Sequence, residues 1–403
     1  MKKIVINLAV TWFLLAVGVG CAAPEDLRVA TKPPPAREQT NTPTPIQPPA
    51  TSEPPTPTTI VAGEFQVHPP VIGNPEPEGE AWKLPSDPLV LVSSEDDELR
   101  EEDPLYPFSI EYLASRTYGD ATYGASTLTF LERLESPYGF SRALITYLSD
   151  GLTIYGFMNI PSGKGPFPVV IFIHGYVEAA KYKTLDYSVR YADDLARRGF
   201  IVIHPNLRGY PPSDSGPDYF EIGKAIDVLN LVGIVQRQAG KTGLLLQADP
   251  DRIAVWGHST GGGIAIRVAA INLPSLTGPG PAVKAAILYA PMSGDETLNA
   301  YRTFYTFSGQ TRWKYEITIP PEQLGPISPV YHYDRIEAAV QIHHGRQDHL
   351  IPVEWSHETC SQMKEAGVTV ECYDYRTQTH NFCCDSYQWM LDRIVSFLGI
   401  YMR

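Results

Sequence analysis

The sequence predicts a mixed α/β fold in which a mostly parallel β-sheet is covered by helices on both faces. From residue 143 onward, short and continuously apolar runs alternate with longer amphipathic runs. Continuous apolar runs are typical of strands buried on both faces, and their alternation with helices is typical of a parallel sheet between two helical layers. In addition, two strand-like runs joined by Asp150-Gly151 predict an antiparallel hairpin at one edge of the sheet.

The elements follow one another along the chain in a regular order. The hairpin strands are expected at 143–148 and 153–160. Strands buried on both faces are expected at 168–174 and 200–204, and further strands at 253–256, 283–289, 340–344 and 369–375. Helices are expected between them at 187–198, 219–237, 260–271 and 355–366, with a closing helix at 387–398.

The segment Gly257-His258-Ser259-Thr260-Gly261 lies between one predicted strand and one predicted helix. A serine on such a sharp strand-to-helix turn projects its hydroxyl above the sheet, and small residues must flank it because the backbone is crowded. The apolar run before the turn and the helical run after it supply the context that the motif requires. The fold predicted is therefore the α/β-hydrolase fold, with Ser259 as the nucleophile.

A serine nucleophile needs a base and an acid, which follow it in the order Ser, acid, His in this fold. His380 lies in the loop after the last predicted strand, and Asp348 follows the strand before it. Asp348 would hold the His380 ring in the correct tautomer and stabilise its charged form. The competing residues precede the last strand or lie away from these loops: His343, His344, His349 and His357 as bases, and Asp334 and Asp374 as acids.

Acyl transfer also needs hydrogen-bond donors for the oxyanion. The backbone N–H of Thr260, directly after the nucleophile, is one candidate. The second is the backbone N–H of Tyr176, which follows the predicted strand ending in His174-Gly175. His174 and His258 are interpreted as structural residues.

Further short motifs surround the elbow. They are Asp150-Gly151 with Tyr155-Gly156, Pro166-Phe167-Pro168 before His174-Gly175, Asn206-Leu207-Arg208-Gly209, the run 249–259, Ser328-Pro329, and His344-Gly345 with Asp348 and Pro352. With these motifs, residues from about 142 to 403 resemble the catalytic domain of the prolyl oligopeptidase family, in particular its dipeptidyl-aminopeptidase and acylaminoacyl-peptidase-like branch. The resemblance implies a serine peptidase with Ser259, Asp348 and His380 as its triad and Tyr176 and Thr260 at its oxyanion hole.

Two departures bear on the substrate. Larger members of that family carry a β-propeller, which needs at least four blades of about 40–50 residues, and residues 61–141 are too few to form one. The segment Gly209-Tyr210-Pro211-Pro212 also differs from the usual continuation of the family's motif. A carboxylesterase, or more weakly a polyester or cutinase-like hydrolase, is the alternative. A non-catalytic binding module on a hydrolase fold is the remote one.

Residues 292–328 interrupt the strand–helix alternation and contain six aromatic residues before Pro320-Pro321. They are expected to form a small cap inserted over the active site. The alternative is a packing cluster that never touches the substrate.

The first 103 residues are expected to be an export signal and a tether. Lys2 and Lys3, an apolar run over residues 4–17 and small residues before Cys21 resemble a lipoprotein signal over residues 1–21, with Cys21 as the lipidated residue. The alternatives are ordinary signal cleavage near Ala22-Ala23 and an uncleaved anchor, and all three place residues 104–403, the catalytic domain, outside the cytoplasm. Residues 22–103 are proline-rich and acidic, which is typical of a disordered tether.

The remaining cysteines, Cys360, Cys372, Cys383 and Cys384, lie near the end of the chain. An even number in an exported protein suggests disulfides. A bond between the neighbours Cys383 and Cys384 would be strained, so pairing of either with Cys360 or Cys372 is sterically easier. Buried free thiols are the alternative. A metal site is not expected, because no Cys-x-x-Cys or His-rich spacing accompanies these cysteines.

The net charge of the chain limits the classes of partner that it is expected to bind. The formal net charge is −13, which argues against nucleic acid because phosphate binding needs a basic surface. Most of this negative charge belongs to residues 22–103, which contain 16 acidic and 5 basic side chains. A small peptide or ester is the expected substrate, with no cofactor, no metal and no membrane contact beyond the lipid anchor. Oligomeric state is not predicted.

Overall fold

The computed structural model describes residues 104–120, 127–136, 139–241 and 243–403. The predicted signal with Cys21, and the predicted tether, lie outside the described residues. Within them, no helix is both long enough and apolar enough to cross a bilayer.

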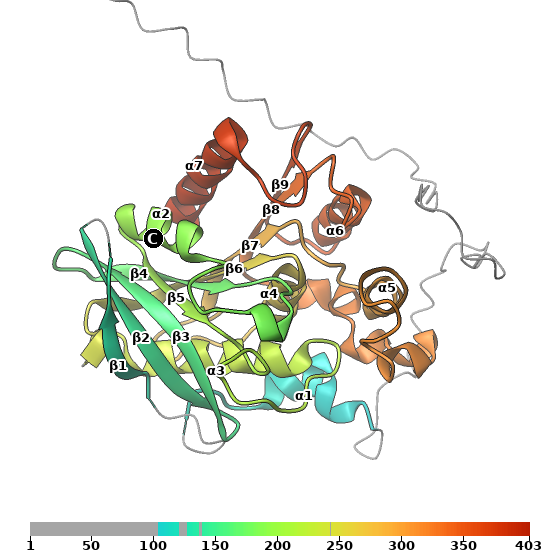
Figure 1. The fold of residues 1–403 in the computed structure, drawn as a ribbon, viewed down its shortest axis with the longest axis horizontal. Helices are drawn as coiled ribbons and strands as arrows, with labels where there is room; N and C mark the ends of the chain where they lie inside the picture. The colour runs from blue at the N-terminus through green and yellow to red at the C-terminus, as the bar shows by residue number, and fades with distance from the viewer. Residues whose placement is uncertain (1–103, 121–126, 137–138, 242) are drawn as a thin grey trace, which may run out of the picture. The chain divides into compact units, whose positions relative to one another are not determined.

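The strands form one mixed sheet in the order β1-β2-β3-β5-β4-β6-β7-β8-β9 (Figure 1). β1, β2, β3 and β5 pair antiparallel, and every pair from β5/β4 to β8/β9 is parallel. The strands are β1 (Thr129–Leu134), β2 (Phe140–Ser149), β3 (Leu152–Pro161), β4 (Phe167–Ile173), β5 (Ile201–Pro205), β6 (Ala248–His258), β7 (Val283–Tyr289), β8 (Ala339–Gly345) and β9 (Val370–Tyr375).

The helices pack on the two faces of this sheet. α2 and α7 contribute to one apolar cluster, and α1, α3, α4 and α6 contribute to the other. β4 shows how the strand supplies both faces, because Ile171 belongs to one cluster and its neighbour Phe172 to the other. The bounds are α1 (Ile110–Ser115), α2 (Val189–Arg197), α3 (Ile222–Gln238), α4 (Thr260–Ile271), α5 (Glu296–Tyr301), α6 (Val353–Glu365) and α7 (Cys384–Tyr401).

This architecture confirms the predicted fold class. The hairpin turns at Asp150-Gly151, with Ser149 opposite Leu152, and the buried strands occur in the predicted order. β1 and α1 were not predicted. β1 is exposed along nearly its whole length, so it lacks the apolar alternation that marks a half-buried strand, and α1 has only six residues.

The predicted insertion over residues 292–328 is built from short elements. α5 continues into a π-helix, η5 (Arg302–Phe307), and three 3-10 turns follow at Glu316–Thr318, Pro321–Gln323 and Gly325–Ile327. In Figure 1 this orange segment lies beside α4 and α6.

The predicted pairing of Cys383 or Cys384 with Cys360 or Cys372 is wrong. Cys360 in α6 is joined to Cys372 in β9, across a Cα–Cα distance of 6.4 Å. α6 packs directly on β9, whereas Cys384 begins α7, Cys383 directly precedes it, and both are exposed free thiols. Sequence separation alone could not show that α6 and β9 are neighbours.

Candidate active site

Ser259 occupies a sharp turn between the end of β6 and the start of α4. Its φ is +59°, in the left-handed region that non-glycine residues rarely adopt. The flanking glycines make this turn possible: a Cβ on Gly257 would lie 2.0 Å from the Gly261 oxygen, and one on Gly261 would lie 2.2 Å from the Ile173 oxygen. The elbow therefore forms as predicted, and its strain is supported by backbone packing on both sides.

Asp348 and His380 meet at the carboxyl ends of β8 and β9. His380 Nδ1 lies 2.7 Å from Asp348 Oδ2, and the Asp348 side chain is 0% exposed. Burial alone would raise the pKa of Asp348. Hydrogen bonds from His344 and His380, with the backbone N–H of Ile351, outweigh burial and hold this pKa well below its usual range. Asp348 is therefore a carboxylate at any working pH and can stabilise a charged His380 ring.

His344 is a partner of Asp348 that the sequence analysis treated only as a competing base. Its Nε2 lies 3.0 Å from Asp348 Oδ2, and its Nδ1 lies 2.6 Å from Ser356 Oγ. His343 instead contacts Tyr375, and His357 contacts Asp374. The contact between His344 and Asp348 spans four residues of a strand end and its turn, and no sequence pattern indicated that the two side chains would meet.

His258 links the elbow to the His380 loop. Its Nε2 lies 3.0 Å from the His380 carbonyl oxygen, and its Nδ1 lies 2.6 Å from the Tyr187 hydroxyl. Burial lowers the pKa of His258 to about 3, so the neutral ring donates from Nε2 and accepts the Tyr187 proton at Nδ1. His258 was predicted to be structural. The structure also places its ring 4.7 Å from the His380 ring, centroid to centroid.

The Ser259 hydroxyl makes no hydrogen bond to another described residue. Hydrogen bonds between a nucleophile and its base are often long before substrate binds and tighten in the complex. Because His258 precedes Ser259 and holds the His380 backbone, the chain still brings the serine and His380 to the same end of the sheet.

The loop after β4 lies against the nucleophile. A Cβ on Gly175 would lie 2.9 Å from the Ser259 Cβ, so the predicted donor Tyr176 follows a residue that contacts the serine. Thr260 opens α4, where the free N–H groups and the helix dipole favour negative charge. His174 is buried between the carbonyls of Gly175 and Asn206, and burial lowers its pKa to about 4.

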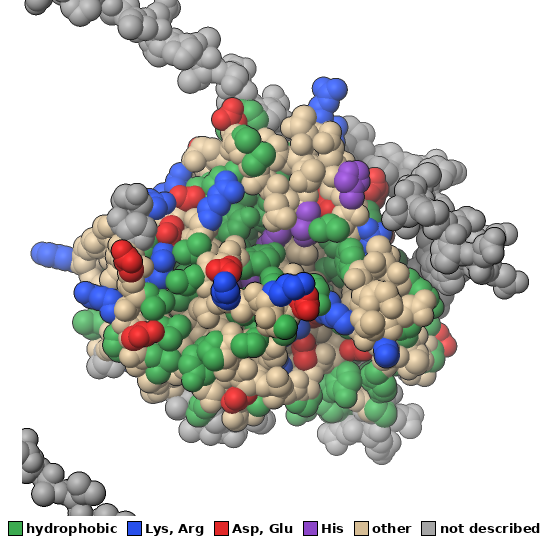
Figure 2. All heavy atoms as spheres, viewed as in Figure 1, with side chains coloured by type: hydrophobic (Ala, Val, Ile, Leu, Met, Phe, Trp, Pro, Cys, Tyr) green, Lys and Arg blue, Asp and Glu red, His purple; other side chains and the backbone are tan. Residues whose placement is uncertain are grey.

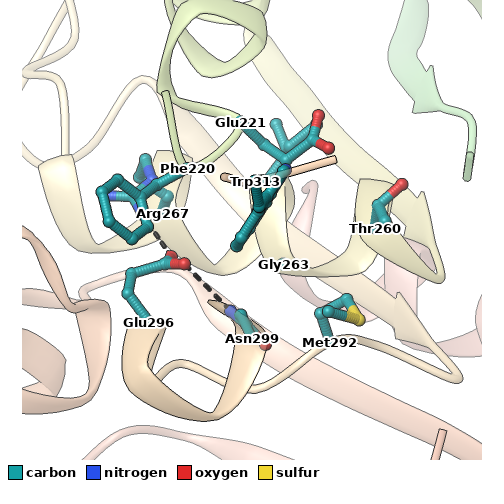
Figure 3. A pocket seen from close by; sticks show the side chains of 10 residues that line it. Phe220, Glu221, Thr260, Gly263, Arg267, Met292, Glu296, Asn299 and Trp313 are labelled. Carbon is teal, nitrogen blue, oxygen red and sulfur yellow. Dashed lines mark hydrogen bonds and ion pairs between the residues drawn. The ribbon is translucent and has the colours of Figure 1, made fainter. Parts of the chain in front are cut away.

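A cavity of about 290 Å³, counting the part open to solvent, adjoins Thr260 (Figure 3). Its apolar lining comes from Phe220, Ile264, Met292 and Trp313. The charged groups along it are paired: Glu296 with Arg267 and Asn299, and Glu221 with Lys224 and Arg312. Since Met292, Glu296, Asn299 and Trp313 belong to residues 292–328, the insertion borders the space beside the nucleophile.

The match to known families agrees with this arrangement. A model of the dienelactone hydrolase family matches residues 154–394, from within β3 to within α7. The chain belongs to the dienelactone hydrolase family. It is therefore a hydrolase enzyme of the α/β-hydrolase superfamily. The finer resemblance to the prolyl oligopeptidase family stays a prediction.

Individual relatives of this hydrolase differ in their named activities. A protein of Bacillus subtilis described as the uncharacterized peptidase YtmA is 24% identical over 246 residues, which cover 59% of this chain and 85% of the relative. Chlorophyllase-1 of Citrus sinensis is 33% identical over 111 residues, covering 27% of this chain and 30% of the relative. The acetyl xylan esterase of Paenibacillus sp. R4 shares the fold, with a TM-score of 0.51, 16% identity and coverage of 72% and 92%.

Among the residues that the structure describes, no group of three or more His, Cys, Asp or Glu side chains is arranged to hold a metal ion. Acidic and basic side chains are interspersed over the described part of the face seen in Figure 2.

Proposed function

We propose that this hydrolase cleaves peptide or ester bonds through an acyl-enzyme on Ser259. The observation that supports the proposal most is the buried 2.7 Å contact between Asp348 and His380, held next to a strained serine turn. An ionised, fully desolvated carboxylate bound to Nδ1 leaves Nε2 of the same ring free to act as a base.

The steps follow from these positions. Ser259 Oγ attacks the substrate carbonyl carbon while His380 Nε2 takes the hydroxyl proton. The oxygen that becomes negative is stabilised by the N–H groups of Thr260 and Tyr176. His380 then gives its proton to the leaving amine or alcohol, and the acyl group stays on Ser259. A water molecule, deprotonated by His380, releases the acid and restores the serine.

The cavity beside Thr260 suits the acyl side of the substrate. The leaving group must lie next to His380, because that ring protonates it, whereas no residue of the His380 loop or the Asp348 loop lines the cavity. Its charged side chains are already paired, so an uncharged acyl group fits better than a charged one. Short peptides are the first substrate class that we propose, as the name of the Bacillus subtilis relative suggests.

Esters are the second class, because an alcohol is an easier leaving group than an amine and needs less protonation. The test is a panel of aminoacyl and peptidyl anilides beside short acyl p-nitrophenyl esters, compared by kcat/KM. We expect turnover of at least one class, lost in His380→Ala. No turnover of any member by folded wild-type protein would favour a non-catalytic binding module instead.

We further propose that the enzyme is exported and held at a membrane surface by a lipid on Cys21. The charged start, the apolar run and the small residues before Cys21 support this. Expression of the full gene followed by membrane fractionation and mass spectrometry of the mature N-terminus tests it. Retention of residues 1–20, or an unmodified Cys21 in soluble protein, would contradict the proposal.

A further inference from the structure

Two consecutive peptide groups separate Asp348 from the side chain of Arg302. The N–H groups of Leu350 and Ile351 donate to Asp348 Oδ1, at 2.8 and 3.0 Å. The carbonyl oxygens of those same two peptide groups belong to His349 and Leu350. Both accept hydrogen bonds from the Arg302 guanidinium, Nη2 to His349 O at 3.2 Å and Nε and Nη2 to Leu350 O at 3.0 and 2.6 Å.

The arrangement is cooperative for a simple geometric reason. In a trans peptide group the C=O and N–H bonds point in opposite directions, so a cation at the oxygen and an anion at the N–H both align with the same dipole. Hydrogen bonds in such chains strengthen one another. Each peptide group here has Arg302 at its oxygen and Asp348 at its N–H.

The guanidinium is suited to this position. Its planar fork can reach two neighbouring carbonyl oxygens at once, which an ammonium group cannot do with the same geometry. Arg302 is the first residue of η5, and its guanidinium lies 5.3 Å from the centre of the Phe307 ring in the same element. Leu350 is 49% exposed, so without Arg302 its carbonyl would be hydrated and its peptide group would be held only by the hydrogen bond from the Ile351 N–H to Asp348.

We propose that Arg302 is a positioning residue for catalysis, which fixes the two peptide groups that orient the Asp348 carboxylate toward His380. It acts through the backbone and does not touch the reacting atoms. The insertion would thereby help to set the geometry of the acid as well as border the acyl cavity. This inference rests on the proposed function, because Asp348 must be the acid that orients the base.

The experiment compares Arg302→Met, Arg302→Gln and Arg302→Lys with wild-type protein on the best substrate of the panel. We expect Arg302→Met and Arg302→Gln to lower kcat by about tenfold with little change in KM, a size typical of coupled residues in one network. Arg302→Lys should recover part of the loss because it keeps the charge and one hydrogen bond. We expect the proton resonance of His380 Nδ1–H at low field in the wild type, because this group donates to Asp348, and we expect it to weaken or move upfield in the first two variants.

Arg346→Met is the matched control. Arg346 is a half-exposed cation two residues from Asp348 that pairs with Asp374, and its loss should leave kcat within twofold. Thermal unfolding of each variant identifies any that fail to fold, in which case Arg302→Lys against wild type decides the outcome. Unchanged kcat and an unchanged His380 proton resonance in folded Arg302 variants would overturn the role of Arg302. Wild-type protein without turnover would instead contradict the proposed function.

Discussion

Asp348 receives more hydrogen bonds than any other side chain discussed at this site. Two ring nitrogens reach its Oδ2 and two backbone N–H groups reach its Oδ1. Each of these contacts favours the ionised form, which explains why its pKa is low although burial acts in the opposite direction. At the residue scale, the site is organised around keeping this carboxylate charged and fixed.

Replacing Asp348 by Asn tests that organisation. The amide has nearly the same shape but no charge, and it can donate a hydrogen bond, so it favours the wrong His380 tautomer. We expect kcat to fall by about 10³–10⁴-fold while KM changes little. Steady-state kinetics with an equally well folded variant measures this, and a loss of less than tenfold would show that another acid serves the base.

The residues that act chemically were easier to predict than those that support them. Ser259, Asp348 and His380 follow from a motif and from chain order, since each lies in the turn or loop that follows a strand of the parallel part of the sheet. Arg302 and His344 could not be found in this way. Their partners are backbone carbonyls and a carboxylate that only the folded turn at 348–351 brings together, and no local pattern marks such a contact.

At the element scale, buried strands and long helices were predicted well because apolar periodicity reports burial. β1 carries almost no buried side chains, so its pairing with β2 had no sequence signal. The disulfide was mispredicted for a related reason: the choice among three pairings depends on which helix packs on which strand. α6 and β9 are neighbours because α6 forms the crossover between the parallel strands β8 and β9 and packs on both of them.

The Cys360–Cys372 bond should stabilise this pair of elements. It closes a loop with a sequence separation of 12 residues, for which chain-entropy arguments give about 3 kcal/mol. We expect the double variant Cys360→Ala/Cys372→Ala to lose about 2–3 kcal/mol of unfolding free energy in urea with little change in kcat. The control, Cys383→Ser/Cys384→Ser, should unfold like the wild type. A loss of unfolding free energy seen only in this control variant would contradict the Cys360–Cys372 pairing.

At the scale of the whole molecule, several histidines are buried as neutral rings. Burial lowers the pKa of His258 to about 3 and that of His174 to about 4. It also holds the pKa values of His204 and His343 well below the usual range. In the unfolded chain these rings bind protons below about pH 6.5, so at mildly acidic pH the unfolded state binds more protons than the folded state.

The contribution of these histidines to stability should therefore be complete above about pH 6.5 and should be lost as the pH decreases from there toward their lowered pKa values. At pH 5 each such histidine should lower the free energy of unfolding by up to about 2 kcal/mol, because each pH unit below 6.5 contributes about 1.4 kcal/mol. Urea unfolding at pH 7.5 and pH 5.0 measures the difference. Equal unfolding free energies at the two pH values would mean that these rings are charged, or exposed, in the folded protein.

Covalent labelling tests most directly whether Ser259 is a nucleophile activated by its surroundings. Folded full-length protein is treated with a fluorophosphonate and digested, and the modified peptide is identified by mass spectrometry. We predict stoichiometric labelling on Ser259, absent in Ser259→Ala and strongly slowed in His380→Ala. No labelling of the wild type, or equal labelling of Ser259→Ala, would show that Ser259 is not the activated nucleophile.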